Sequence, residues 1–333
     1  MRPAALAELA AFSAAIGRNP EQVQAAGGNT SLKADGLLWV KASGLWLADA
    51  ATRDIFVPVG LEPVLQGIAD DAPDPVSGAV AAELNPEGLR PSIETTLHAL
   101  LPHRVVIHTH SVRTIALAIR QDGEAQIARR LAGLRWAWVP YCKPGLPLTR
   151  GVAARLERAP VDVLILGNHG LVVGADSVIE ADVLLAEVER RVDAPAARLK
   201  LDQPRTPAPA GTRLPRHAMV HALACDPLRR VRACGGSLYP DHVIFLGPAA
   251  AALDPAAPVA ASASKLLVAP GHGAFLAADA GVSGDELALC LALVLERVPP
   301  EATLQYLTAA DEAELMDWDA EKYRQGLARS RPG

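Results

Sequence analysis

Apolar residues recur in two patterns over the first 193 positions, and together they predict a sheet flanked by helices. Short apolar runs bounded by glycine, proline or polar residues are typical of strands, and apolar residues three or four positions apart are typical of helices. The early strands are joined by short turns, so the sheet need not be all parallel. We predict strands at 37–41, 54–59, 105–110, 136–141, 161–166 and 170–174, and helices at 1–17, 60–71, 92–101, 111–121, 124–132, 148–158 and 178–192.

The pattern changes at residues 194–215, which are rich in proline, alanine and arginine and have no apolar period. Such a stretch is typical of a linker. A chain of 333 residues is long enough for two domains. We therefore predict one domain at 1–193 and a smaller α+β domain at 216–333. Within the second we expect strands at 242–246 and 265–268, and helices near 219–224, 285–297, 300–307 and 311–327.

Composition excludes several classes of protein. The formal net charge is −5, which offers no basic surface for nucleic acid. No apolar run approaches the roughly 20 residues that cross a bilayer, so we expect no membrane partner. The four cysteines are scattered without a CxxC pair, which favours reduced thiols in a cytoplasmic protein. No GxGxxG fingerprint follows a strand, and there is no GxxxxGK loop, so nucleotide binding lacks support.

Two histidines end the strand predicted at 105–110. His108 and His110 are two positions apart, so both imidazoles leave the same face of a strand. His169 lies between glycines after a second apolar run and could complete a three-nitrogen shell with an open fourth position, as in catalytic zinc sites. The alternative is that the pair are polar residues on a half-solvated face.

Two corners of small residues flank the strand at 37–41. Gly27 and Gly28 precede Asn29 in a segment, 25–33, that we predict to be a loop, and Ser43 and Gly44 follow the strand. Backbone amides in such corners can face an anion, with Lys41 as a nearby charge. This arrangement could form one side of a phosphate or carboxylate pocket. Two ordinary turns are the alternative.

Glu94 lies at the start of the helix predicted at 92–101, where Ser92 is a plausible N-cap. An acidic residue there commonly complements the helix dipole. The helix that begins near Glu94 directly precedes the histidine strand in the chain, so the Glu94 carboxylate could lie beside a metal bound by the histidines. His98 and His103 fit no motif, and we expect supporting or surface positions for them.

These pieces, taken in order, resemble the class II aldolase/adducin family, which includes fuculose- and rhamnulose-phosphate aldolases. The matching motifs, within residues 25–192, are 28–31 (GNTS), 41–44 (KASG), 91–94 (PSIE), 108–110 (HTH) and 168–170 (NHG). The resemblance implies a three-layer α/β/α sandwich around a largely antiparallel sheet, usually in a ring-shaped homotetramer with active sites between subunits. It also implies His108, His110 and His169 as metal ligands and Glu94 as the acid/base. Positions gripping a substrate phosphate in the family are occupied here by Asn29, Ser43, Gly44 and Ser92.

The expected activity is that of a zinc-dependent lyase, with manganese or cobalt as other candidate ions. It would cleave or form a C–C bond in a hydroxyketone or sugar phosphate through a metal-stabilised enediolate. The same fold hosts epimerases, dehydratases and decarboxylases of sugar acids, and these stay alternatives. A non-catalytic, adducin-like interaction module is a third, against which the retained histidines and Glu94 count.

Three departures from the family pattern change this picture. Ile93 stands where the phosphate grip commonly has a second serine, which removes a hydroxyl. Fuculose-phosphate aldolases use a tyrosine from the neighbouring subunit as a proton donor, yet residues 111–135 contain none, and Tyr141 is the nearest candidate. Residues 216–333 lie outside the motifs. Some longer relatives carry a dehydrogenase, but the missing fingerprint favours an accessory domain that covers the site or mediates assembly.

Overall fold

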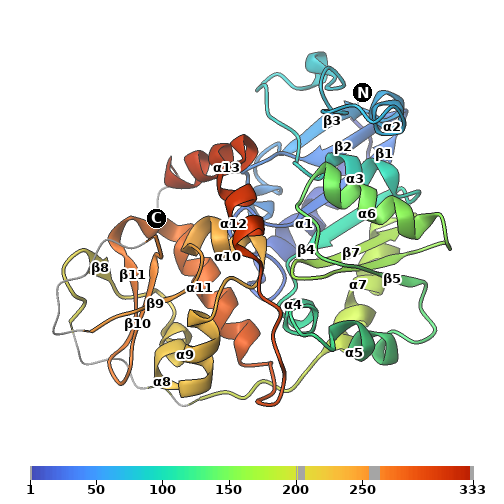
Figure 1. Cartoon of the computed structure of the whole chain (residues 1–333). Helices are drawn as coiled ribbons and strands as arrows, with labels where there is room; N and C mark the ends of the chain where they lie inside the picture. Colours follow the sequence, from blue (N-terminus) through green and yellow to red (C-terminus); the bar gives the residue numbers. More distant parts are fainter. Residues whose placement is uncertain (1, 200, 202–206, 255–262, 331–333) are drawn as a thin grey trace.

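A computed structural model of the chain describes residues 2–199, 201, 207–254 and 263–330. In Figure 1 the N-terminal part, coloured blue to green, lies beside the C-terminal part, coloured yellow to red.

The N-terminal part is built on a seven-stranded sheet in the order β3-β2-β1-β4-β7-β6-β5. Neighbouring strands are antiparallel except β5 and β6, which are parallel. The prediction of a largely antiparallel sheet is confirmed. The strands are β1 (Asn29–Ala34), β2 (Leu37–Lys41), β3 (Phe56–Gly60), β4 (Val105–Thr109), β5 (Trp136–Val139), β6 (Val163–Leu166) and β7 (Gly170–Ala175).

Alternation along each strand gives the sheet two apolar faces, and helices cover both. On β4, Val106 packs against α3 and α6, whereas Val105 and Ile107 pack in the core that includes α1 and α7. The sandwich therefore has three layers, as predicted. Its helices are α1 (Ala5–Gly17), α2 (Leu61–Ala69), α3 (Thr95–Leu100), α4 (Val112–Ala118), α5 (Gly123–Arg130), α6 (Leu146–Leu156) and α7 (Val178–Val192).

The β1–β2 hairpin shows one prediction confirmed and one that is wrong. Asp35 and Gly36 turn with φ of 52° and 75°, the positive values that a tight hairpin needs. However, strand β1 already begins at Asn29, inside the segment predicted as a loop. Its polar sequence lacks apolar alternation. It nevertheless forms a strand because β2 and β4 pair with it on both sides.

The C-terminal part has a four-stranded sheet in the order β8-β11-β10-β9. Strand β8 lies inside the range that the sequence predicts as a linker. The strands are β8 (Thr212–Arg213), β9 (Ala251–Ala252), β10 (Leu266–Ala269) and β11 (Gly273–Ala277). The helices are α8 (Ala222–Cys225), α9 (Pro227–Cys234), α10 (Pro240–Leu246), α11 (Gly281–Leu295), α12 (Ala309–Met316) and α13 (Asp319–Ser330).

Three C-terminal predictions are wrong. The strand expected at 242–246 is part of helix α10, which begins at Pro240; proline suits the first turn of a helix because its missing N–H has no partner there. All seven residues of α10 are buried, so its sequence shows no amphipathic period and a strand could not be told from a helix. The helix expected at 300–307 is absent from that described segment, and 311–327 forms two helices, α12 and α13.

The two parts share a core through α4. Its buried residues Val112, Ile115 and Ala116 pack in the same apolar cluster as α10 and α11. Ser111 caps α4 by accepting a hydrogen bond from the Thr114 backbone N–H, 3.1 Å away. Helix α4 therefore starts two residues after His110, and the C-terminal part packs directly against the segment that carries this histidine.

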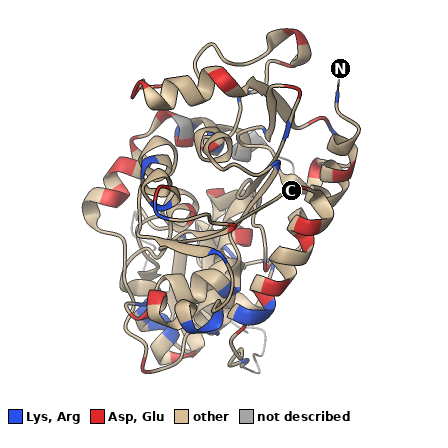
Figure 2. Cartoon of the chain, turned by 90° about the vertical axis from the view of Figure 1, so that its right-hand side faces the viewer, with Lys and Arg blue, Asp and Glu red and all other residues tan. Residues whose placement is uncertain are grey.

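Charged residues lie mainly on the outer helices. Figure 2 shows acidic and basic residues on the side turned toward the viewer, including both signs along the long helices. On α7, Glu187 pairs with Arg190 and Arg191 at 2.9 and 2.6 Å. Within the described ranges, no helix is both long enough and apolar enough to cross a membrane.

Candidate metal site

Three histidines from separate segments converge at one end of the sheet. His108 lies near the end of β4, His110 just beyond it, and His169 in the β6–β7 hairpin. Pairing of Leu166 with Gly170 closes this hairpin, and Asn168 turns it with φ of 51°. The candidate ligand atoms of the three imidazoles all lie within 4.8 Å of one another, and all three side chains are buried.

The His108 ring is oriented so that one nitrogen is free to bind an ion. Its Nδ1 lies 3.0 Å from the Leu171 carbonyl oxygen, so Nδ1 carries the proton and donates it. Its Nε2 is buried and has no hydrogen-bond partner in the described part of the chain. An unsatisfied buried polar atom is costly, and a metal ion would satisfy it. The residues present therefore fit a divalent metal.

His108 and His169 are in the protonation state that metal binding requires. Burial lowers the pKa of His108 below its usual range and lowers the pKa of His169 to about 3. Both rings are consequently neutral at pH 7. Neutral imidazole is the form that binds metal ions, because a protonated nitrogen has no lone pair to offer.

Glu94 faces two of the imidazoles. Its Oε2 lies 3.4 Å from Nε2 of His108, and its Oε1 lies 3.6 Å from Nε2 of His169. Burial by itself would raise the pKa of Glu94, but the positive charge that His108 and His169 carry once they are protonated at low pH, together with the hydrogen bond from the Asn29 amide, outweighs it and lowers this pKa to about 2. The carboxylate is thus ionised beside the histidine nitrogens.

Glu94 is held in place by a chain of buried side chains. Asn29 Nδ2 donates to Glu94 Oε2 at 2.8 Å, and Asn29 Oδ1 accepts from His98 Nε2. His98 Nδ1 lies 2.7 Å from the Ser31 hydroxyl. Both ring nitrogens of His98 are therefore engaged, and burial lowers its pKa to about 3. His98 therefore has a supporting position, in which it holds Asn29 and through it Glu94. The sequence had left a supporting or a surface position open for it.

The helix start at Glu94 differs from the prediction. The sequence favoured Ser92 as the N-cap, but α3 begins at Thr95 and Glu94 occupies the cap position. Ser92 Oγ instead accepts a hydrogen bond from the Glu94 backbone N–H at 3.2 Å. This bond fixes the backbone that aims the Glu94 carboxylate at the histidines.

Lys41 is buried and holds the glycine corner. Its Nζ donates to the carbonyl oxygens of Ala26 at 2.6 Å and Gly28 at 3.0 Å. Burial lowers its pKa to about 7. Lys41 lines the pocket, and its Nζ already donates two hydrogen bonds to the backbone.

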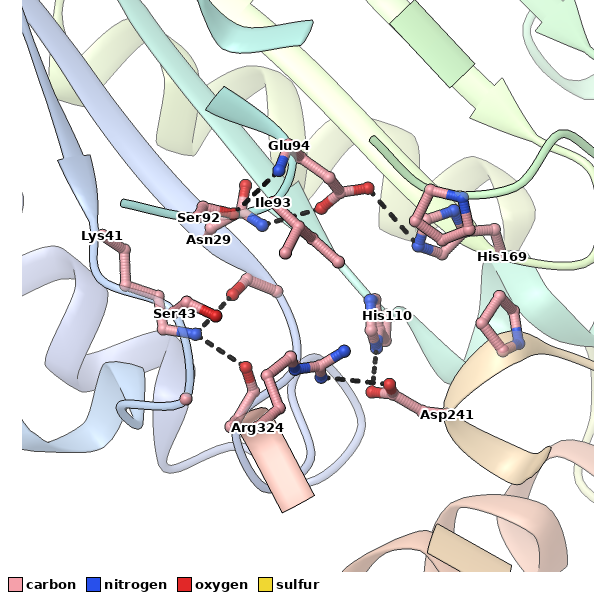
Figure 3. A pocket seen from close by; sticks show the side chains of 16 residues that line it. Asn29, Lys41, Ser43, Ser92, Ile93, Glu94, His110, His169, Asp241 and Arg324 are labelled. Carbon is pink, nitrogen blue, oxygen red and sulfur yellow. Dashed lines mark hydrogen bonds and ion pairs between the residues drawn. The ribbon is translucent and has the colours of Figure 1, made fainter. Parts of the chain in front are cut away.

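The predicted substrate-binding residues surround one pocket beside the histidines (Figure 3). Its open volume is about 30 Å³, room for a few water molecules. Helix α13 closes it, because Leu327 lies directly over Gly44. The predicted residues that line it are Asn29, Lys41, Ser43, Gly44, Ser92, Glu94, His110 and His169.

Two lining residues, Asp241 and Arg324, come from the C-terminal part and were not found from the sequence. Asp241 lies in the first turn of α10 and Arg324 on α13. The Pro240-Asp241 pair is a helix-start signal, and it could have placed Asp241 at a helix N-terminus had the segment not been interpreted as a strand. Nothing in the sequence marks Arg324.

Tyr141, the candidate proton donor, does not line this pocket in the described structure. It packs against the C-terminal core, and burial raises the pKa of its hydroxyl well above its usual range. The group that protonates a leaving oxygen is therefore not assigned to it.

Known proteins match the N-terminal part of the chain. An uncharacterized oxidoreductase, YuxG, of Bacillus subtilis is 32% identical over 188 residues, which are 53% of this chain and 27% of that protein. The chain thus spans about a quarter of this relative. An L-fuculose phosphate aldolase of Methanococcus vannielii is 29% identical over 166 residues, 48% of this chain and 78% of that enzyme.

A solved structure is also similar to the N-terminal part of the chain. The N-terminal class II aldolase domain of a conserved Thermoplasma acidophilum protein is 29% identical, with a TM-score of 0.48. The match covers 56% of this chain and 90% of that one. The family model described as "Class II Aldolase and Adducin N-terminal domain" matches residues 7–194, more than half of the chain. With its layered sheet and its cluster of histidines, the chain belongs to the class II aldolase and adducin family.

Proposed function

We propose that this protein is a metal-dependent lyase of the aldolase type, with zinc, manganese or cobalt held by His108, His110 and His169. The observation that carries the proposal is the convergence of three buried imidazoles, with candidate ligand atoms within 4.8 Å of one another, beside an ionised carboxylate. When bound, a divalent ion supplies Lewis-acid charge that stabilises negative charge developing on substrate oxygens.

Glu94 is the proposed acid/base. Its carboxylate lies beside the histidine nitrogens and is fixed by Asn29, so it can take a proton from the substrate and return it at a defined position. The surrounding wall is small and polar at Ser43, Gly44 and Ser92, which suits the oxygen-rich end of a hydroxyketone or sugar phosphate. Ile93 offers no hydroxyl there, so a phosphate would find fewer donors than in the family pattern.

An epimerase, dehydratase or decarboxylase of a sugar acid is the alternative, because the same carboxylate and metal can serve each reaction. We also expect a homo-oligomer, with the tetramer implied by the family resemblance.

The proposal is tested on protein purified without added metal and then loaded with zinc, manganese or cobalt. We expect close to one ion per chain by elemental analysis, and turnover of one member of a panel of phosphorylated ketoses and sugar acids. An aldehyde plus a ketone identifies the lyase, whereas water loss, carbon dioxide or an epimer identifies the alternative. Less than a tenth of an equivalent of metal, with none regained on loading, would overturn the enzyme proposal.

A further inference from the structure

We infer that Asp241 is a positioning residue for His110, so that the C-terminal part of the chain completes the proposed metal site. This inference rests on the proposed metal binding and adds a role for a region that carries none of the family motifs. His110 Nδ1 lies 3.1 Å from Asp241 Oδ2, and both side chains are buried (Figure 3).

The Asp241 carboxylate is held on one side only. Arg324 Nη2 donates to Asp241 Oδ1 at 3.1 Å, and the same guanidinium pairs through Nη1 with Glu321 Oε1 at 2.8 Å. The other oxygen, Oδ2, is buried and has no hydrogen-bond partner among the described residues, although it lies next to the His110 ring. Asp241 Oδ2 is therefore placed to accept a hydrogen bond from a protonated His110 Nδ1.

The chemistry of metal-bound histidine explains why such a partner matters. An imidazole that binds a metal through one nitrogen carries its proton on the other, and an acceptor there fixes the ring and makes the ligand more basic. His108 has the Leu171 carbonyl oxygen as this acceptor. For His110 the corresponding acceptor is the Asp241 carboxylate, which leaves Nε2 as the ligand atom.

The local backbone is shaped around this contact. A Cβ atom added at Gly27 would lie 2.7 Å from His110 Nδ1 and 2.9 Å from Asp241 Oδ2. Both distances are shorter than side chains tolerate, so the contact requires glycine at position 27.

The segment before Asp241 also holds the other ligand-bearing loop. Asn168 Nδ2 donates to the carbonyl oxygens of Leu238 at 3.0 Å and Gln305 at 2.7 Å. The C-terminal part therefore contacts both the His110 segment and the hairpin that carries His169.

The test compares metal affinity in the full-length protein and its Asp241→Asn variant, measured by competition with a chromogenic chelator for zinc and cobalt. The substitution keeps the shape of the side chain and removes its charge. Loss of an outer partner of a metal ligand typically weakens binding about 10- to 100-fold, and we expect a loss in this range. The visible absorption bands of the cobalt-loaded variant should also shift, because they report the ligand geometry, which a purely structural role would leave unchanged.

Asp285→Asn is the matched control. Asp285 is also in the C-terminal part, is equally buried, and pairs with Arg213 at 2.8 Å, yet it does not line the pocket. We expect Asp285→Asn to lower the unfolding temperature and leave metal affinity and the cobalt spectrum unchanged. Gly27→Ala is the second test variant, because it should disturb the His110–Asp241 contact without removing a charge, and we expect weaker metal binding from it too.

The outcomes separate this inference from the function proposed above. Wild-type protein that binds no metal overturns both. Wild-type protein that binds metal, with Asp241→Asn equal to it in affinity and spectrum, overturns only the role of Asp241. Equal weakening by Asp241→Asn and Asp285→Asn also overturns it, because the effect would then follow from general loss of C-terminal packing. If Asp241→Asn fails to fold, wild-type affinity in Gly27→Ala overturns the inference.

Discussion

The N-terminal sheet and the C-terminal part both reach the pocket, but they hold their side chains by different means. His108 is fixed by the hydrogen-bonded ladder between β4 and its neighbours β1 and β7. Asp241 lies on α10 and Arg324 on α13, and both are placed by the packing of those helices on α11 and on each other. The sheet thus determines where the imidazoles are. Helix packing places the Asp241 carboxylate beside the His110 ring.

The largest expected effect tests the chemical role of the N-terminal part. Glu94→Gln replaces a carboxylate by a neutral amide of the same shape and should lower turnover by roughly 10²- to 10⁴-fold, the usual contribution of a general acid or base. Bound metal, measured by elemental analysis, should be retained because the three histidines are untouched. Wild-type turnover in this variant would reduce Glu94 to an acidic residue at a helix start.

The next largest effect, a change in the free energy of unfolding, tests whether the N-terminal and C-terminal parts unfold as one unit. Ile115 is fully buried on α4, in the core shared with α10 and α11, and Ile115→Ala should destabilise the protein by about 2–5 kcal/mol. We expect a single denaturant transition for wild type and variant, followed by fluorescence and by circular dichroism. Leu185→Ala on α7 is the matched control, since this residue packs only in the N-terminal core.

Two separate transitions, with only one shifted by Ile115→Ala, would contradict this view. The C-terminal part would then be an independent unit that rests against the sheet, and α4 would not couple them.

The smallest effect concerns His98, which supports Asn29 and Glu94 from within the N-terminal part. Burial lowers its pKa to about 3, against a usual value near 6.5, so below pH 6.5 the unfolded chain binds a proton that the folded protein refuses. Stability should therefore fall as the pH drops from about 7 toward 3. His98 contributes on the order of 1 kcal/mol of this loss between pH 7.5 and 5.5.

The measurement compares wild type and His98→Gln by urea unfolding at several pH values, with a chelator present so that metal binding does not contribute. The other buried histidines act equally in both proteins and cancel. An identical pH slope in the two proteins would show that His98 takes up its proton as readily in the folded protein as in the unfolded chain.

The sequence predicted the parts of this molecule whose signal is local. The strands predicted at 37–41 and 161–166 contain the apolar runs 37–40 and 163–166, and the spacing of His108 and His110 on a strand needs no knowledge of distant contacts. Asn29 was expected in a loop because the sequence of β1 is polar and lacks apolar alternation. The segment is a strand because it pairs with β2 and β4. Asp241 and Arg324 were missed because their positions depend on how α10 and α13 pack, which no short stretch of sequence encodes.

Helix α13 combines two contacts with one consequence. Leu327 lies over Gly44 and leaves about 30 Å³ in the pocket, whereas small-molecule sites generally offer roughly 300–1,000 Å³. We therefore expect a sugar-sized ligand to bind only when α13 shifts away from Gly44. Arg324, one turn earlier on the same helix, would leave Asp241 with it. Entry of a ligand would then separate the Arg324 guanidinium from Asp241, the carboxylate that lies beside His110. The contact would form again when α13 returns.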